Sequence, residues 1–238
     1  MIIKCPNDFT GHTDKWKVFL AGPIQGAPKW QDQLPDLDNV VWISPRREDG
    51  AVLNDKTHKQ QMEWETRALR TANIILFWIP EEVEHIEGRG YAQTTRFELG
   101  ENMARGKRII LGAYKEFPGR QYLEYKANKY GNVIHRNVYS TLDECVNALK
   151  NYIKMSEDFP MIYYESDPNF EEERCAIPDK FINPFFMQEH EDWKKIEAWN
   201  RKVNPTDTVI VHGNFGHEWA LKYLSGNIDL SKGRELKL

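Results

Sequence analysis

Glu98 is the residue whose type and position are best suited to chemistry in this sequence. It lies in Thr95-Arg-Phe-Glu-Leu-Gly100, where the pattern predicts a helix from about Thr95 to Arg105 that ends at Gly106. A carboxylate in the first turn of a helix that follows a sheet strand can act as a nucleophile or as a base. The same position also suits an ordinary glutamate that the positive end of the helix dipole favours.

Alternating strand-like and helix-like segments must position this glutamate. We expect strands at 17–21, 40–43, 73–79, 108–111 and 132–138, and helices at about 58–71, 95–105 and 141–154. This alternation predicts the α/β class: a doubly wound, five-stranded, mostly parallel sheet of the flavodoxin or Rossmann type. In such a sheet, the loops at the carboxyl ends of the strands line the ligand crevice.

A second region begins near residue 156, where the sequence becomes acidic and aromatic. It is followed by a predicted helix at about 190–201, a strand at 207–212 and a short helix from about 217. We therefore expect two domains: an α/β domain over 1–155 and a small α/β extension over 156–238.

Composition excludes several classes of function. The chain has 32 Lys and Arg against 36 Asp and Glu, a formal charge of −4, so no global basic field favours nucleic acid or a membrane surface. No apolar run reaches membrane-spanning length and no signal peptide is evident, so we expect a cytoplasmic protein. Cys5, Cys145 and Cys175 form no CxxC pair, which is typical of a reducing compartment without a zinc knuckle. We expect no metal and no cofactor.

Several pieces of the sequence, in this order and spacing, resemble the nucleoside 2-deoxyribosyltransferase-like family. The resemblance covers about residues 15–115. The pieces that carry it are Val18-Phe-Leu-Ala-Gly-Pro23, Gln61-x-x-Trp64-Glu65, Ala72-Asn-Ile-Ile-Leu-Phe-Trp-Ile-Pro80, Thr95-Arg-Phe-Glu-Leu-Gly100 and Gly106-Lys107.

The resemblance implies two catalytic carboxylates. In that family the glutamate of the Glu-Leu-Gly turn is the nucleophile, and the matching residue is Glu98. It would attack the anomeric carbon to give a glycosyl-enzyme, which a second base or water resolves. Glu65 matches a second carboxylate that protonates the departing base or holds a sugar hydroxyl; the alternative is a solvated helix carboxylate.

The substrate-binding residues are expected around these carboxylates. Gly22-Pro23 would allow close approach of the backbone to the sugar or base, and Trp78 either stacks on the base or belongs to the core. Arg46 and Arg47 either grip a 5′-phosphate or are a plain solvated pair. The expected substrate-binding set is Gly22, Pro23, Gln25, Arg46, Gln61, Trp78, Thr95 and Arg96.

Two positions depart from the family. Members often carry a tyrosine in the first strand that orients the nucleophile, and the matching residue is Phe19. We therefore expect Gln61 or Arg96 to hold Glu98. Many members also have an aspartate shortly before the nucleophile, whereas residues 91–97 contain no carboxylate, so substrate recognition is expected to differ.

Residues 161–238 resemble the first half of calcineurin-like metallophosphoesterases, with eroded metal ligands. We predict a degenerate module without a dinuclear centre, used for packing, oligomerisation or covering the crevice. An isolated site at Asp167, His212 and His217 is the alternative. The positions that match the family's ligands are Asp167, Asn169, Asn214 and Gly233-Arg234-Glu235.

The favoured hypothesis is an enzyme that cleaves the N-glycosidic bond of a nucleoside or nucleotide and transfers the sugar to a free nucleobase. Hydrolysis of a deoxynucleotide or dinucleotide is the alternative reaction, and a non-catalytic nucleotide sensor is the alternative from another class. A phosphoesterase is disfavoured because most of its ligands are missing. The family resemblance further implies a homo-oligomer.

Overall fold

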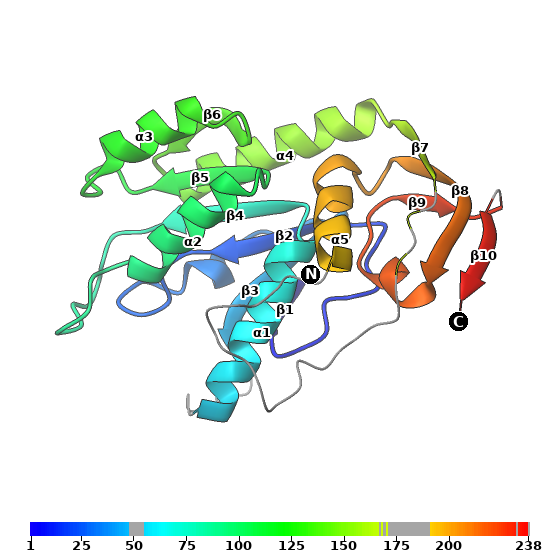
Figure 1. Cartoon of the computed structure of the whole chain (residues 1–238). Coiled ribbons are helices and arrows are strands. Elements are labelled where there is room, and N and C mark those ends of the chain that lie inside the picture. The colour runs from blue at the N-terminus through cyan, green and yellow to red at the C-terminus, as the bar shows by residue number, and fades with distance from the viewer. Residues whose placement is uncertain (48–54, 167, 169, 171–190, 232, 238) are drawn as a thin grey trace. The chain divides into compact units, whose positions relative to one another are not determined.

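The computed structural model describes residues 1–47, 55–166, 168, 170, 191–231 and 233–237 (Figure 1). The chain folds into two compact units. Unit 1 contains Met1–Phe9 and Lys15–Phe159, and unit 2 contains Thr10–Asp14 and Pro160–Leu238. No helix in the described ranges has the length and apolar character needed to cross a bilayer.

Unit 1 is built on a six-stranded sheet whose pairings are all parallel. The strand order is β1-β3-β2-β4-β5-β6, so the direction of winding reverses between β2 and β4. This confirms the predicted doubly wound α/β class, because β2 to β6 follow the flavodoxin-like order. The strands are β1 (Ile2–Cys5), β2 (Trp16–Ala21), β3 (Val40–Arg47), β4 (Ile74–Ile79), β5 (Ile109–Ala113) and β6 (Val133–Tyr139).

The expected number of five strands was wrong, because β1 adds a sixth at the sheet edge beside β3. β1 has only four residues, and just two of them, Ile3 and Cys5, are buried. So short a strand gives too weak a periodic signal to separate it from a polar N-terminal segment. β3 also continues to Arg47, past the point where a polar loop was expected.

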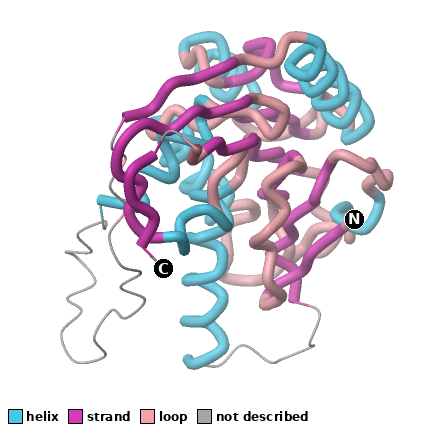
Figure 2. The backbone as a smooth tube through the Cα atoms, turned by 90° about the vertical axis from the view of Figure 1, so that its right-hand side faces the viewer, coloured by secondary structure: helices cyan, strands magenta, loops and turns pink. Residues whose placement is uncertain are grey.

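Helices cover both faces of this sheet, and the alternation of strands and helices can be followed in Figure 2. Side chains of α1 (Asp55–Thr71), α2 (Gln93–Ala104) and α3 (Arg120–Lys129) pack on one face. Side chains of α4 (Leu142–Asp158) and the 3₁₀ helix η1 (Trp30–Gln33) pack on the other. The helix α3 was not expected from the sequence.

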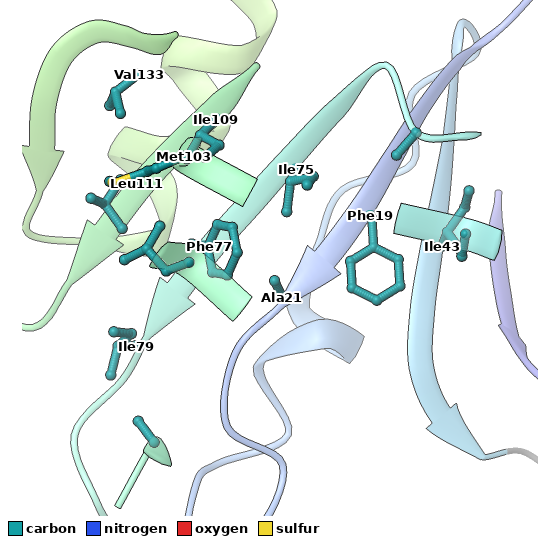
Figure 3. Packing of buried hydrophobic residues seen from close by; sticks show 14 of the residues in the cluster. Phe19, Ala21, Ile43, Ile75, Phe77, Ile79, Met103, Ile109, Leu111 and Val133 are labelled. Atoms are coloured by element: carbon teal, nitrogen blue, oxygen red, sulfur yellow. The ribbon is translucent and has the colours of Figure 1, made fainter. Parts of the chain in front are cut away.

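The central strand β4 shows why this sheet is stable. Ile75, Phe77 and Ile79 point into the core under α1 and α2 (Figure 3). Their neighbours in the strand belong to the opposite core, and every residue of the strand is buried. A continuous apolar run is what a parallel strand covered on both faces requires, so the prediction of a central strand is confirmed.

The start of α4 is also confirmed. Thr141 Oγ1 accepts a hydrogen bond of 3.2 Å from the backbone N–H of Glu144, and a Glu144 carboxylate oxygen accepts one of 3.1 Å from the Thr141 N–H. This reciprocal capping box satisfies backbone donors that would otherwise have no partner in the helix.

The other edge of the sheet is irregular. The pairing of β6 with β5 shifts register between Ile109 and Leu111. His135 and Arg136 of β6 have φ values of 59° and 49°, in the left-handed region that residues with a side chain rarely adopt. Both side chains are exposed, so this edge strand is bent and charged.

Unit 2 contains a second, smaller sheet centred on β8 (Thr208–His217), which pairs in parallel with β7 (Ile162–Ser166), β9 (Asn227–Asp229) and β10 (Gly233–Lys237). Ile196 and Trp199 of α5 (Glu191–Lys202) pack with Val209, Val211 and Phe215 of β8. β8 extends five residues beyond the expected strand end, because Phe215 continues its buried row. The short helix expected from about 217 is the 3₁₀ helix η2 (Glu218–Lys222).

Candidate functional site

A cavity of about 570 Å³ lies in unit 1 at the carboxyl ends of its central strands. Its wall contains the end of β3, the turn that follows β2, the segment from Glu82 to Glu98 and part of α1. This is the edge at which the strand order reverses, where α/β sheets bind ligands. Eight of the ten predicted site residues line it: Gly22, Pro23, Gln25, Arg46, Gln61, Glu65, Thr95 and Glu98.

The turn after β2 is shaped by close packing against β4. A Cβ atom on Gly22 would lie 2.2 Å from the Trp78 carbonyl oxygen and 2.8 Å from Trp30 Cζ2. The Trp30 indole N–H also donates to the Pro23 carbonyl oxygen at 3.4 Å. Glycine is therefore required at this position by the protein's own packing, whereas the sequence interpretation assigned that requirement to a bound sugar or base.

Glu98 reaches the cavity from the second turn of α2, which corrects the expected position in the first turn. The helix begins at Gln93, after Ala92 takes a left-handed conformation with φ 55°, so Glu98 is its sixth residue. The helix dipole acts mainly within the first turn, so it contributes little to the charge of Glu98.

Glu65 is held by a neighbour one helical turn away on α1. The Gln61 side-chain amide donates to a Glu65 carboxylate oxygen at 2.8 Å and to the Pro45 carbonyl oxygen at 3.3 Å. The amide therefore links α1 to the end of β3 and orients Glu65 along the cavity wall. Gln61 was expected to hold either the substrate or Glu98, and the structure places it on Glu65.

The two carboxylates influence one another electrostatically. Burial, the negative charge of Glu65 and that of Glu101 raise the pKa of Glu98 to about 7. Burial also raises the pKa of Glu65, while the hydrogen bond from Gln61 and the charge of His58 oppose that rise. Repulsion from the charge of Glu65 adds to burial because a second negative charge is unfavourable in a partly dry site.

Trp78 and Arg96 are not among the residues that line the cavity. Trp78 is 7% exposed and belongs to the core beneath α4. This position matches the core alternative for Trp78 and not the one in which it stacks on a base. The Arg96 guanidinium lies over the Phe117 ring at 4.9 Å, so Arg96 is engaged on the outer side of α2.

The two arginines at the end of β3 are each bonded to the protein. Arg46 donates from Nε to the Gln31 amide oxygen at 2.7 Å, and from Nη2 to the carbonyl oxygens of Pro28 at 3.3 Å and Ile24 at 3.5 Å. Arg47 donates to the Thr57 carbonyl at 3.4 Å and to the Gln60 amide oxygen at 3.2 Å. Both residues belong to β3 and not to a loop, and these bonds do not match the alternative of a plain solvated pair.

Other cavity residues were missed by sequence reasoning. Gly26 accepts a hydrogen bond of 2.8 Å from the Val83 N–H, and Arg89 contacts the side chain of Gln25, so the loops after β2 and β4 are joined above the cavity. No motif marked these loops, since their contacts depend on the sheet order. The additional wall residues with polar or charged side chains include Lys4, Lys29, Asp32, His58, Glu82, Arg89 and Tyr91, and Arg47, which the sequence interpretation had named, also lines the cavity.

The metal-ligand positions expected in unit 2 fall only partly among the described residues. Across the described ranges, no three His, Cys, Asp or Glu side chains are placed to hold a metal ion. His212 stacks on Tyr164 with ring centroids 6.1 Å apart, and the Asn214 amide oxygen accepts a 3.0 Å bond from the Gly216 N–H. Asp167, Asn169 and Cys175 lie outside the described residues, and Gly233-Arg234-Glu235 is described only as the backbone of β10.

Comparison with known proteins identifies one region of the chain. Residues 15–116 match the family model described as "Nucleoside 2-deoxyribosyltransferase like", which confirms the resemblance seen in the motifs. All of the matched residues lie in unit 1, and they include both cavity carboxylates. No curated protein matches the sequence.

Proposed function

Starting from a region that is nucleoside 2-deoxyribosyltransferase-like over residues 15–116, we propose that the protein cleaves an N-glycosidic bond of a nucleoside or nucleotide and transfers the sugar to another base. Glu98 is the covalent nucleophile, and Glu65 is the acid and base that serves the departing and arriving bases. The remaining cavity wall binds the sugar, its 5′ substituent and the base.

The observation that carries this proposal is that Glu98 and Glu65 line the same cavity and that burial raises the pKa of both carboxyl groups. Cleavage of a glycosidic bond needs one ionised carboxylate near the anomeric carbon and one proton for the leaving group. A pocket that only binds a nucleotide has no need of two partly desolvated carboxylates, which cost folding free energy. The pair therefore favours an enzyme over a sensor.

The chemical step balances with these two residues. A Glu98 carboxylate oxygen bonds to C1′ as the bond from C1′ to the base nitrogen breaks, and the bonding electrons leave with the base. Glu65 gives its proton to the base nitrogen, so the base departs neutral. An incoming base then attacks C1′ through a nitrogen whose proton passes to Glu65, and the ester to Glu98 breaks.

Hydrolysis differs from transfer only in the acceptor. Water in place of the second base would deliver its proton to Glu65 and release the free sugar. Both reactions pass through the same glycosyl-Glu98 ester, so one experiment tests the shared step.

The test is intact-protein mass spectrometry with a panel of deoxynucleosides and their 5′-monophosphates, while chromatography follows free base. We expect an adduct of glycosyl mass that maps to Glu98, and base release that falls more than about a thousandfold in Glu98→Gln. Glu63→Gln is the matched control, because Glu63 is an exposed glutamate of α1 away from the cavity. Base release at the wild-type rate in Glu98→Gln would refute the assignment.

A further inference from the structure

The cavity wall has more basic than acidic side chains, although the chain as a whole is acidic. The wall contains five Lys and Arg residues (Lys4, Lys29, Arg46, Arg47 and Arg89) and four acidic ones (Asp32, Glu65, Glu82 and Glu98), in a chain whose formal charge is −4. Even with all four acidic side chains ionised, the wall carries a net charge of +1. A cavity of this sign favours an anionic ligand.

Arg46 is a half-buried cation whose bonded partners are all neutral. Its hydrogen-bond acceptors are one side-chain amide oxygen and two backbone carbonyl oxygens. Burial lowers the pKa of Arg46, and only the more distant charge of Asp32 opposes this effect. Nε and Nη2 donate within the protein, so Nη1 is the nitrogen of this partly desolvated guanidinium that is left to donate to a phosphate.

Gln31 fixes the orientation of this guanidinium. It is 1% exposed, and its amide oxygen receives the Arg46 Nε–H at 2.7 Å. Among the described residues, the amide nitrogen of Gln31 has no hydrogen-bond partner. Burying an unpaired donor is unfavourable. The hydrogen bond to Arg46 opposes this cost and holds the Gln31 amide in place.

Lys29 adds a second cation beside Arg46. It follows Pro28, whose carbonyl oxygen accepts from Arg46 Nη2, so the two residues are brought together by the same turn. Lys29 lines the cavity and is exposed, and its side chain makes no hydrogen bond or ion pair with the part of the chain that is described. Its ammonium group is therefore able to move onto an anion that Arg46 binds.

Strand order places these cations opposite the nucleophile. β3, which carries Arg46, lies on one side of β2, and β4, which leads to the helix of Glu98, lies on the other. Neighbouring strands are ~4.8 Å apart, so β3 and β4 are separated by about 10 Å, a gap that a sugar with its 5′ substituent can span above the Gly22-Pro23 turn. In the proposed binding mode, C1′ of this sugar lies toward Glu98 and its 5′ carbon lies toward Arg46.

We propose that Arg46 and Lys29 form a subsite for the terminal 5′-phosphate, so that the enzyme acts on nucleoside 5′-monophosphates in preference to nucleosides. The identity of the ligand as an N-glycoside rests on the proposed function, whereas phosphate binding by these two residues does not. Gln31 is a positioning residue that acts through Arg46.

The first experiment compares kcat/KM for base release from each deoxynucleoside and its 5′-monophosphate. We expect kcat/KM for the monophosphate to exceed that for the nucleoside by roughly 100-fold. Lys29→Gln and Arg46→Gln should each reduce this ratio by roughly 10-fold or more, because one charge-assisted hydrogen bond typically contributes that much. The readout is the ratio of the two kcat/KM values, so a loss of activity that affects nucleoside and monophosphate alike would count against the subsite. Lys150→Gln, an exposed substitution on α4, is the control.

The second experiment measures binding without chemistry. Titration calorimetry with a nucleoside 5′-monophosphate and with the nucleoside should show a loss of the affinity difference in Lys29→Gln, which removes an exposed side chain and should not affect folding. If no substrate releases base while this difference is present, the proposed function fails and the subsite stands. Equal affinity for both ligands in the wild-type protein, or equal losses for both in the variants, would overturn the subsite.

Discussion

Replacing Glu98 by glutamine should stabilise unit 1 at alkaline pH while it removes activity. The fold raises the pKa of Glu98 from its ordinary 4.5 to about 7, so the folded state binds the proton more tightly than the unfolded state. For a carboxylate shifted in this direction, the folded state is favoured at low pH and loses stability as the pH rises from about 4.5 to about 7. At roughly 1.4 kcal/mol per pH unit, the upper limit of this loss is about 3 kcal/mol.

The expected loss of unfolding free energy is about 2 kcal/mol, because Glu98 is only half-buried and solvent screens part of the effect. Urea unfolding at about pH 5 and about pH 8 measures it, with hydrogen exchange of peptides from β4 reporting on unit 1 alone. Between these pH values, the free energy of unfolding of the wild-type protein should fall by about 2 kcal/mol more than that of Glu98→Gln. Glu63→Gln should behave like the wild type. An equal pH dependence in wild type and Glu98→Gln would show that the carboxylate is not desolvated by the fold.

Three further outcomes follow from the geometry. Base release should rise as the pH increases through about 7, because Glu98 must be ionised to attack C1′ and its pKa is raised to about 7; a rate that does not change between about pH 5 and about pH 8 would exclude Glu98 as the nucleophile. Gly22→Ala should lower the free energy of unfolding by about 1–3 kcal/mol or more in urea titrations, since its Cβ would overlap the Trp78 carbonyl oxygen, and an unchanged midpoint would contradict that overlap. Thr141→Ala should lower the free energy of unfolding by about 1 kcal/mol in the same assay, because the α4 capping box is lost. Thr141→Ser keeps a hydroxyl that can cap the helix, so its free energy of unfolding should stay close to that of the wild type.

Sequence reasoning found the sheet because its strands are buried on both faces. The run from Ile74 to Ile79 has no polar residue to compete with a strand assignment, and the Thr141-x-x-Glu144 pattern has a direct physical meaning at a helix start. Where these local signals were strong, the elements lie within a few residues of their expected positions.

The cavity could be predicted only in part. Glu98, Glu65 and the Gly22-Pro23 turn follow strands or lie on helices that the sequence identified, so the topology of the sheet brought them together. Lys4 was missed because β1 was missed, and Arg89 because its loop has no periodic pattern. Side-chain pairing depends on distances across the sheet, which a sequence without a structure does not contain.

The two outer strands of the unit 1 sheet affect how copies of this protein can associate. β1 offers only four residues, and β6 is interrupted where His135 and Arg136 turn into the left-handed region. An exposed strand recruits a second copy by extending its hydrogen-bond ladder, and a short or bent edge is a poor template for that process. We therefore expect any self-association of unit 1 to proceed through side chains of its helices and loops, and the protein to resist the edge-to-edge aggregation that long flat strands promote.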